Sequence, residues 1–521
     1  MLCPFPAKYA FSHGVWFIAF SYSGRGAAMS GPKRKPILPY GLDWTRLSVS
    51  GDSAMEMRHP YLPMTKEIEE EMLKSMGRAT LEELFSNIPA NFRLRRDLNL
   101  PSSHSELEVI QRMHALAEKN TPANTGRVFL GGGVGLHYVP AAVSSVASRS
   151  EFVTAYTSYQ PEVSQGMLQT LFEYQSLLAE LLDVDVVNSS LYDMGTSLGE
   201  AARMVARVNK KSTRFLVPST VNPSHYRVML TYTEPAGITI EKVGHDAKTG
   251  LMSMPDLKKK LDEGAAGVYI ENPSYLGFLE HQVDEISKAV HDAESLLVAG
   301  VDVLSMGLLR PPGNYGADIV IGEGQVLGNP ASYGGPLLGV FGCKNDRKLV
   351  YQLPGRLVGM TTTLEEPYEQ GFVLTLSPRE QHIRREKATS NICSNQALMA
   401  VNAAIYMSVL GPAGLSQLSE TIAYRSNYAA KRLGQIPGVE APGIGTSHWK
   451  DFVVRFRSGI SSSAVHEALL KRGYHGGKIL NDEFPELGES MLFSVTEMHS
   501  KESIDGMVEA VKQIVTKGGG K

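Results

Sequence analysis

Cysteine is scarce in this sequence, and its placement excludes several kinds of site. The 521 residues include only three cysteines, Cys3, Cys343 and Cys393. They are odd in number and have neither metal-ligand spacing nor a C-x-x-C pair, so no metal site is expected. This usage favours a reducing compartment, and we interpret each cysteine as a small buried residue rather than as a nucleophile.

A strong net charge and a long apolar run are also missing. The formal net charge is -3 and the isoelectric point is near 6.6. Nucleic-acid binders and membrane-surface proteins need a dominant basic field, so both classes are disfavoured. No stretch approaches the ~20 consecutive apolar residues of a spanning helix. We therefore expect a soluble, cytoplasmic protein whose partners are proteins and small molecules.

What is present is ordinary globular composition, with 43% hydrophobic and 20% charged residues. This is enough for two or three domains. Residues 1–56 differ from the rest, because the apolar segment 15–20 is too short for a signal peptide and the basic cluster 33–35 follows it. We expect an extension that is disordered or outside the native start, with Met55 or Met57 as the more natural first residue. A targeting sequence is the disfavoured alternative.

Residues 57–125 are expected to form an N-terminal helical arm. Thr65 and Thr80 each precede a run with acidic residues, so each is expected to cap a short amphipathic helix with an acidic first turn. A further helix is expected over 105–118. Such an arm either wraps a neighbouring subunit or domain, or packs on the chain's own core.

Residues 126–377 alternate strand and helix patterns with a period of roughly thirty residues, which indicates a large α/β domain. A mostly parallel sheet covered on both faces follows from this alternation. A last strand within 334–341 is expected to return antiparallel. The expected strands are 214–217, 238–243, 267–270, 296–300 and 318–321, with helices such as 254–261 and 283–294 between them.

Residues 378–521 predict a linker helix and a small α/β domain with a sheet of its own. The apolar helix 395–410 is expected to end at Gly411 and Pro412, a usual stop signal. Beyond it, we expect strands at 452–456 and 491–495, and helices at 463–472 and after Ser500.

The glycine-rich stretch 316–335 is the centre of the predicted site. The buried strand 318–321 leads into it, and Asp302 lies just past the neighbouring strand 296–300. In open α/β sheets, ligands collect outside the carboxyl ends of the strands. The sequence therefore predicts a ligand site at this edge.

An enzyme of the pyridoxal-phosphate (PLP) aminotransferase type needs two groups at such an edge. One is an acid facing the pyridine nitrogen, and the other is a lysine in the glycine-rich loop that forms the Schiff base. Asp302 is the candidate acid, but Gln325 takes the place of the lysine. An amide cannot form an imine with an aldehyde. We therefore interpret the chain as the scaffold of a cofactor enzyme that lacks its own chemistry and works beside a partner.

Two other loops carry weaker ligand signals. The glycine cluster 131–135 does not match the dinucleotide fingerprint, so a tight turn without a ligand is preferred there. The stretch 188–202 runs from a loop into a helix, where Gly195, Thr196 and Ser197 are placed to hold a phosphate at the helix N-terminus. An ordinary threonine or serine cap is the equal alternative.

Four runs of residues resemble one family closely. They are Tyr-Gln-Pro-Glu-x-Ser-Gln-Gly at 159–166, Asn-x-Ser-x-Tyr-Asp at 188–193, Gly-Ala-Asp-Ile-Val at 316–320 and the long, specific run 371–397. Over about 57–516, the chain resembles the glycine decarboxylase, or P-protein, of the glycine cleavage system. Its length and the absence of a second homologous half resemble the alpha subunit, subunit 1, of the two-chain form.

The resemblance implies a type I PLP-dependent transferase fold and a partner beta subunit that carries the PLP and its lysine, with an α2β2 assembly expected. Together the subunits would decarboxylate glycine, release CO2 and pass the aminomethyl group to the lipoyl group of H-protein. Two positions depart from the family pattern. Leu136 precedes His137 where an aspartate is usual, and the glycine of the Tyr-Asp turn lies one place later, at Gly195 after Met194. Both departures weaken a ligand role for those loops.

On this resemblance, no catalytic residue is expected in this chain. The residues expected to reach the partner's cofactor site across the interface are Tyr159, Gln160, Glu162, Gln165, Ser390 and Asn391. Interface hydrogen bonding is the equal alternative for them. The expected vestigial pocket contains Asp302, Thr196 and Gln325.

A basic cluster and two rival functions remain. Arg379, Arg384, Arg385 and Lys387 would attract acidic H-protein or a carboxylate, although a solvated, salt-bridged helix face is the commoner outcome for such mixed charge. One rival is a self-sufficient PLP enzyme that uses Lys344 or Lys387. The other is a purely structural subunit.

Overall fold

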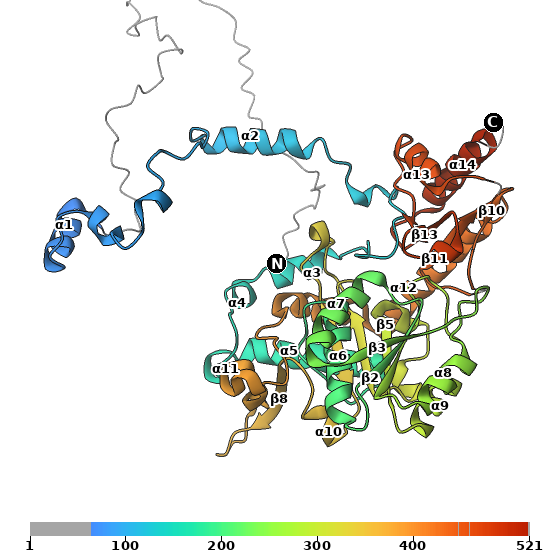
Figure 1. Cartoon of the computed structure of the whole chain (residues 1–521), viewed down its shortest axis with the longest axis horizontal. Coiled ribbons are helices and arrows are strands. Elements are labelled where there is room, and N and C mark those ends of the chain that lie inside the picture. Colours follow the sequence, from blue (N-terminus) through green and yellow to red (C-terminus); the bar gives the residue numbers. More distant parts are fainter. Residues whose placement is uncertain (1–63, 446, 458, 519–521) are drawn as a thin grey trace, which may run out of the picture. The chain divides into compact units, whose positions relative to one another are not determined.

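The structure is a computed structural model that describes residues 64–445, 447–457 and 459–518. The chain divides into two compact units, Met1–Val109 and Ile110–Lys521 (Figure 1). The expected extension 1–56 lies outside the described residues, as does Cys3. The predicted domain boundaries at residues 125 and 377 stay predictions.

Two of the predicted arm helices form as expected. In α1 (Lys66–Ser75), the Thr65 hydroxyl accepts a hydrogen bond from the Ile68 N–H at 3.3 Å. In α2 (Glu106–Ala117), Ser105 and Glu108 bond each other reciprocally, with the Ser105 N–H 2.7 Å from the carboxylate and the Glu108 N–H 3.3 Å from the hydroxyl. This is a capping box, which satisfies backbone donors that have no partner inside the helix.

The expected second helix takes a different form. Residues Leu81–Phe85 make a short 3-10 helix, and the Thr80 side chain does not cap it, so this part of the prediction is wrong. The Thr80 hydroxyl donates to the Glu83 carboxylate at 3.4 Å instead. Glu83 therefore engages the hydroxyl that was expected to serve as the cap.

Seven strands of the second unit form one sheet, in the order β1-β7-β6-β5-β4-β2-β3. The strands from β3 to β6 run parallel, whereas β7 is antiparallel to both β6 and β1. The strands are β1 (Val186–Val187), β2 (Arg214–Pro218), β3 (Thr239–Val243), β4 (Gly267–Glu271), β5 (Leu296–Asp302), β6 (Ile319–Glu323) and β7 (Gly339–Cys343). The predicted parallel sheet and its antiparallel return strand are confirmed.

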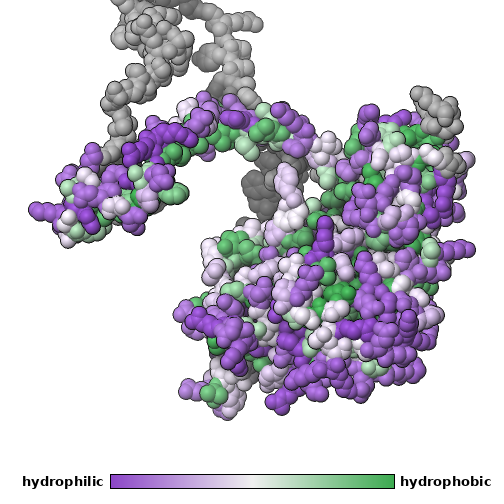
Figure 2. All heavy atoms as spheres, viewed as in Figure 1, coloured by the Kyte–Doolittle hydropathy of each residue, from purple (hydrophilic) through white to green (hydrophobic). Residues whose placement is uncertain are grey.

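Helices cover both faces of this sheet (Figure 1). Alternate residues of a strand point to opposite faces, so Leu297 and Ala299 belong to one buried apolar cluster and Val298 to the other. Helices α5, α8, α9 and α12 contribute to the first cluster, and α6 and α7 to the second. Their apolar residues fill the interior, and the visible surface of the second unit is mostly hydrophilic (Figure 2).

The α-helices that follow the arm lie within the second unit. They are α3 (Ala141–Ala147), α4 (Ser150–Val153), α5 (Gln165–Leu182), α6 (Met194–Val208), α7 (Pro223–Thr233), α8 (Met254–Asp262), α9 (Val283–Asp292), α10 (Arg347–Val350), α11 (Gln381–Arg384), α12 (Ala397–Leu433), α13 (Ser462–Leu470) and α14 (Lys501–Gly518). A separate antiparallel pair consists of β8 (Leu357–Thr362) and β9 (Gln370–Thr375).

Helix α12 continues past its predicted end. Gly411 leaves the helical conformation, with φ 61° and ψ -179°, as the stop signal indicated. Pro412 then begins a second helical segment, which proline does well because its φ is already fixed at a helical value. By length and composition α12 would suit a membrane span, but its apolar residues belong to the buried clusters on either side of Gly411.

The C-terminal part has the predicted sheet of its own, with strand order β10-β11-β13-β12. Its strands are β10 (Val439–Glu440), β11 (Asp451–Phe456), β12 (Lys478–Ile479) and β13 (Ser490–Ser494), all antiparallel to their neighbours. Helices α13 and α14 and the second segment of α12 share one buried cluster with these strands.

A close approach of two backbones joins the two sheets of the second unit. Gly277, in the loop after β4, has φ +93°, and a Cβ there would overlap the carbonyl oxygen of Asp451. Around this contact, Tyr275 and Phe278 of the loop share a buried apolar cluster with Leu492 of β13. The absence of a side chain permits the contact, so the loop after β4 is held against the small sheet.

Replacing Gly277 by alanine is therefore expected to be costly. We expect Gly277→Ala to lower the free energy of unfolding by more than about 2 kcal/mol, because the new methyl group must displace backbone. Gly237→Ala is the matched control: its φ is +67° and nothing lies near the added Cβ, so a loss of about 1 kcal/mol is expected. Urea unfolding of both variants measures the difference, and equal losses would contradict the close approach.

Candidate functional site

A cavity of about 270 Å³ lies at the carboxyl ends of β4, β5 and β6, beside the start of β11. This is the edge of the sheet at which the sequence predicts a ligand site. Its lining includes the polar side chains of Glu271, Ser274, Asp302, Glu323, Lys450 and Asp451. The glycine cluster 131–135 closes another side through Gly132, Gly133 and Gly135.

Gln325 is buried and uses its whole amide to join two loops. Its Oε1 accepts from the Gly135 N–H at 3.1 Å. Its Nε2 donates to the carbonyl oxygens of Gly135 at 3.2 Å and Asn329 at 2.7 Å. Val326, rather than Gln325, lines the cavity. The glycine cluster 131–135 is therefore fixed to the glycine-rich loop by a side-chain amide.

Asp302 ends β5 and is already paired. Its Oδ1 accepts from the Leu304 N–H at 3.1 Å, and its Oδ2 accepts from the Lys450 ammonium. Burial lowers the pKa of Lys450, but the negative charges of Asp302 and Asp451 outweigh this effect and leave the pKa raised. Lys450 is thus held as an ammonium ion, which is not a nucleophile.

The N-terminus of α6 meets two carboxylates of its own chain. Asp193 is the N-cap residue, and its Oδ1 accepts from the Thr196 N–H at 2.7 Å and from the Thr196 hydroxyl at 3.0 Å. Glu323 accepts from the Met194 N–H at 3.1 Å. The expected threonine or serine cap is therefore wrong, because the aspartate before the helix takes that position. Of the backbone donors at the predicted phosphate position, the Thr196 and Ser197 N–H groups are bonded within the chain, both to Asp193.

Glu323 was not singled out by sequence reasoning, although it is central to the site. It is the last residue of β6, and besides Met194 it accepts from the N–H groups of Gln325 at 3.0 Å and Leu338 at 2.8 Å. Burial raises its pKa to about 7, although the three hydrogen bonds act in the opposite direction. An acid between two glycines at a strand end is the only sequence signal that marked it.

The residues of this cavity do not fit PLP. The amine that lines it, Lys450, is paired with Asp302. The donors at the start of α6 that bond Asp193 and Glu323 are engaged by carboxyl groups of the chain itself rather than left open for a phosphate. Asp302 is present as the expected acid, but its partner is Lys450 rather than a free ring nitrogen.

Neither of the two other lysines considered from the sequence reaches this cavity. The Lys344 ammonium donates to the Gly316 carbonyl at 2.9 Å and pairs with Asp318 at 3.0 Å, at the end of β6 opposite to Glu323. Lys387 is exposed in a 3-10 helix. The lysine in the cavity, Lys450, lies far along the chain and was not a sequence candidate.

The two runs predicted to face a partner come together around a buried arginine. Arg356 donates to the Tyr159 hydroxyl at 2.8 Å and to the Cys393 carbonyl, and its guanidinium lies 4.8 Å from the centre of the Tyr159 ring. His382 packs edge-on against Tyr159, with ring centres 5.6 Å apart. Tyr159 is 49% exposed, whereas Arg356 is 5% exposed. Sequence reasoning missed Arg356, which lies outside both runs.

Other candidates in these runs divide into side chains that bond the chain's own backbone or core and side chains of exposed residues. Gln165 brackets the backbone of Phe372, accepting from its N–H at 2.8 Å and donating to its carbonyl at 2.9 Å. Ser390 is buried and donates to Glu200 at 2.7 Å. Gln160, Glu162 and Asn391 are exposed. Gln165 and Ser390 therefore hold the loops in place, Asn391 bonds the Tyr232 side chain, and Gln160 and Glu162 are exposed polar side chains.

The basic cluster contains one internally bonded side chain and three exposed ones. Arg379 donates to the carbonyl oxygens of Leu376 and Gly355, so it holds its own loop in place, whereas Arg384, Arg385 and Lys387 are exposed.

The two described cysteines differ in burial. Cys343 is buried as predicted, but Cys393 is exposed, and that prediction is wrong. Cys393 lies in the loop that Arg356 holds by its backbone, which leaves its side chain outside the core.

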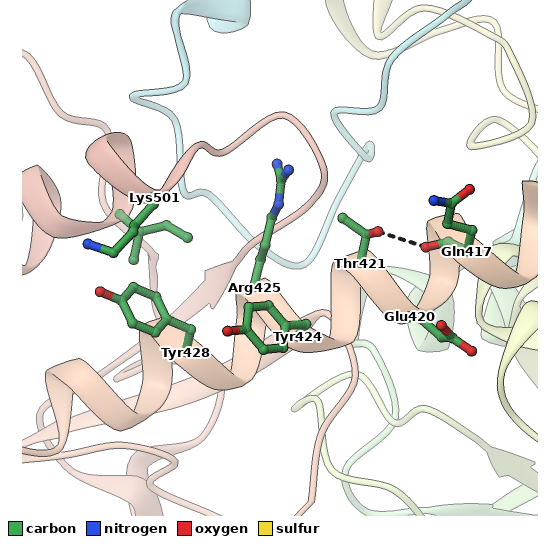
Figure 3. Close-up of a pocket in the computed structure, with 8 residues that line it drawn as sticks. Gln417, Glu420, Thr421, Tyr424, Arg425, Tyr428 and Lys501 are labelled. Carbon is green, nitrogen blue, oxygen red and sulfur yellow. Dashed lines mark hydrogen bonds between the residues drawn. The ribbon is translucent and has the colours of Figure 1, made fainter.

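A larger groove, of about 630 Å³, lies between α12 and the start of α14 and is unrelated to this chemistry (Figure 3). Arg425 donates to the carbonyl oxygens of Glu497 at 2.6 Å and His499 at 2.9 Å. The Lys501 ammonium donates to Asp505 at 2.6 Å. Arg425 therefore attaches the loop before α14 to α12, whereas the Lys501 pair lies within α14.

The raised pKa of Glu323 predicts a pH dependence of stability. A carboxyl whose pKa rises from 4.5 to about 7 on folding contributes stability that is present below pH 4.5 and lost as the pH approaches 7. This shift corresponds to roughly 3 kcal/mol. Between about pH 5 and pH 8, we expect wild-type stability to fall by up to that amount relative to Glu323→Gln. Urea unfolding at both pH values is the measurement. The exposed Glu420→Gln should follow the wild type, and parallel behaviour of Glu323→Gln would contradict the prediction.

Comparison with known proteins places this geometry in a family. A family model described as glycine cleavage system P-protein matches residues 59–511. The probable glycine dehydrogenase (decarboxylating) subunit 1 of Staphylothermus marinus is 45% identical over 468 residues, which cover 88% of this chain and 98% of that protein. Its namesake in Pyrococcus horikoshii is 46% identical over 460 residues, with 88% and 100% covered.

Solved structures agree. The inhibitor-bound crystal structure of a glycine decarboxylase (P-protein) of the glycine cleavage system has a TM-score of 0.78 and 38% identity, covering 88% of this chain and 100% of that one. A sphingosine-1-phosphate lyase from Burkholderia pseudomallei has a TM-score of 0.60 at 11% identity, over 82% and 94% of the two chains, which is a likeness of fold alone. The predicted type I PLP-dependent transferase fold is confirmed. Because the family model matches most of its length and the subunit 1 relatives are matched over nearly their whole length, this chain belongs to the P-protein family of the glycine cleavage system.

Proposed function

We propose that this chain is the alpha subunit of glycine decarboxylase, the subunit without a Schiff-base lysine. It works with a lysine-bearing beta subunit that carries the PLP, in a cytoplasmic α2β2 assembly. The complete enzyme decarboxylates glycine, releases CO2 and transfers the aminomethyl group to the lipoyl group of H-protein. The subunit 1 relatives support a two-chain enzyme, because a numbered subunit implies a second one.

The observation that carries this proposal is the state of Gln325. In the loop where such an enzyme needs a lysine, a buried amide makes three hydrogen bonds to Gly135 and Asn329. The side chain is occupied as well as chemically unsuited to imine formation. The pairing of Lys450 with Asp302 supports the same conclusion, because the amine in this cavity is held as an ammonium ion.

On this proposal, the chain contributes surface and position rather than a reacting group. Arg356 holds Tyr159 from beneath, and Gln160 and Glu162 follow it as exposed polar side chains. We name Tyr159, Gln160 and Glu162 the Tyr159 surface. Held this way, the Tyr159 surface can present polar groups to the partner's cofactor site with little loss of side-chain entropy. The exposed Arg384, Arg385 and Lys387 are available to acidic H-protein.

The first test asks whether the chain takes up the cofactor by itself. The isolated chain is mixed with PLP, reduced with borohydride and mapped by peptide mass for pyridoxyl-lysine. We expect no stoichiometric adduct at Lys450, Lys344 or Lys387. Glycine-dependent CO2 release should require a lysine-bearing beta chain and H-protein. A stoichiometric adduct that disappears in Lys450→Arg would instead make this chain a self-sufficient PLP enzyme.

The second test separates a contribution to the partner's site from a purely structural role. Tyr159→Phe keeps the ring over Arg356 but removes the hydroxyl that accepts its hydrogen bond. We expect kcat of the reconstituted enzyme to fall about tenfold, the usual effect of one charged hydrogen bond, while the subunit ratio stays unchanged. Tyr424→Phe, which alters an exposed tyrosine of the α12 groove, is the control and should leave kcat unchanged. Unchanged turnover with altered assembly would favour the structural subunit.

A further inference from the structure

We infer that the cavity at the carboxyl ends of β4 and β5 binds a small primary amine, held as an ammonium ion by Glu271, Asp451 and Ser274. This binding site is additional to the proposed function and does not depend on where PLP is carried. Three kinds of observation support it: polar atoms without partners, the charge of the lining, and the size of the cavity.

Polar atoms in this cavity lack the partners that buried atoms normally have. Ser274 is 6% exposed, and within the described ranges its hydroxyl has no hydrogen-bond partner. The same holds for Oδ1 of Asp451. Both residues line the cavity. Because nearly all buried polar atoms in folded proteins are bonded, these acceptors indicate a bound molecule or ordered water.

The carboxylates of the cavity differ in how fully they are hydrogen-bonded. Asp302 is paired with Lys450, and Glu323 accepts three N–H groups. Glu271 accepts one backbone N–H, from Tyr275 at 3.1 Å. Asp451 has an oxygen with no partner among the residues that the structure describes. Glu271, which also has the Tyr269 side chain as a neighbour, is thus less fully bonded than Glu323, and Asp451 keeps a free acceptor. Both groups are acidic, and they favour a cation over an anion.

The electrostatics of these two acids agree with a missing cation. Burial raises the pKa of Glu271 to about 8, and the negative charge of Asp451 adds to the effect. Burial also raises the pKa of Asp451, and the positive charge of Lys450, which is shared with Asp302, offsets this effect only in part. His225, which lines the same cavity, supplies no positive charge near neutral pH, because burial lowers its pKa to about 4. A cation between the two carboxylates would offset this cost.

The acceptor groups and the volume of the cavity indicate which kind of cation would bind. No group of three or more histidine, cysteine, aspartate or glutamate side chains suited to a metal ion exists among the described residues. A primary ammonium group carries three N–H donors, which matches three acceptors on Glu271, Asp451 and Ser274. The 270 Å³ volume is below the ~300–1,000 Å³ of pockets for drug-sized ligands, so the ligand is small.

The loop that carries Glu271 and Ser274 is held rigidly against Asp451. Gly277 lies against the Asp451 backbone, where a side chain would not fit. The Tyr275 hydroxyl donates to Glu483 at 3.1 Å and accepts from Lys478 at 2.8 Å. The acceptors are therefore positioned before a ligand arrives, which reduces the entropic cost of binding.

The test uses the full chain and ethylamine as the probe. We expect a saturable rise in Tm and a near-millimolar Kd by isothermal titration calorimetry, as suits a ligand of so few heavy atoms. Potassium chloride and sodium acetate at equal ionic strength should give no such rise. Calorimetry near pH 7 in two buffers of different ionisation enthalpy should detect proton release, because the ammonium favours the charged form of Glu271.

Matched variants distinguish a ligand site from a structural feature. Glu271→Gln and Asp451→Asn should each weaken ethylamine binding at least tenfold. Asp451→Asn should not lower the Tm without ligand, since it keeps the shape of the side chain and removes a buried charge whose Oδ1 has no hydrogen-bond partner in the described residues. The exposed Glu420→Gln should bind like the wild type. Three results would overturn the inference: an equal Tm rise with potassium chloride, binding that is retained in both acid variants, or no saturable binding at all. The last result would mean that the cavity holds only water.

Discussion

The carboxylate of Glu323 is the group on which the arrangement of the site depends. It accepts N–H groups from three segments: the first turn of α6, the glycine-rich loop after β6, and the residue before β7. The first N–H groups of any helix have no partner within it, and the helix dipole favours negative charge there. Burying a carboxylate costs several kcal/mol, so it persists only where such donors converge. Glu323 therefore fixes α6, the loop and the return strand relative to one another.

Gln325 extends this framework to a second loop. Its backbone N–H is one of the donors to Glu323, while its side chain hydrogen-bonds Gly135 and the Asn329 carbonyl. The backbone and the side chain of one residue thus connect the strand end to the glycine cluster 131–135. A lysine at this position would provide donors only and would leave the Gly135 N–H without its acceptor. The loop therefore requires an amide at this position, whereas the sequence alone shows only that a lysine is absent.

The sheet was predictable from the sequence because its strands are buried on both faces. Such strands need continuous apolar runs, and β4, β5 and β6 lie within a residue or two of their predicted positions. The second segment of α12 was missed because a glycine and a proline end a helix locally without preventing another from starting. Asp302 was found at a strand end, and the resemblance located the runs around Tyr159. Family resemblance does not show which side chains of a run point outward.

The groups that the sequence could not supply are joined across long chain distances. Lys450 pairs with Asp302 across 148 positions, and Arg356 donates to Tyr159 across 197. No local pattern marks such pairs, because each partner alone resembles an ordinary surface charge. Glu323 escaped notice for a related reason, since its donors are backbone N–H groups that every residue carries. Sequence patterns thus located the edge of the sheet, and only the fold showed how its charges are matched.

Arg356 shows why the Tyr159 surface is suited to an interface. The guanidinium is 5% exposed, yet part of its hydrogen bonding goes to Tyr159, which is half exposed. Its Nε has no hydrogen-bond partner within the described part of the chain, and its Nη2 forms a long ion pair of 3.9 Å with an oxygen of Glu380 that likewise has no hydrogen bond there. Electrostatic interactions strengthen when water is excluded. A second chain covering Tyr159 would therefore strengthen the bonds that hold it, so assembly and orientation of this surface would reinforce each other.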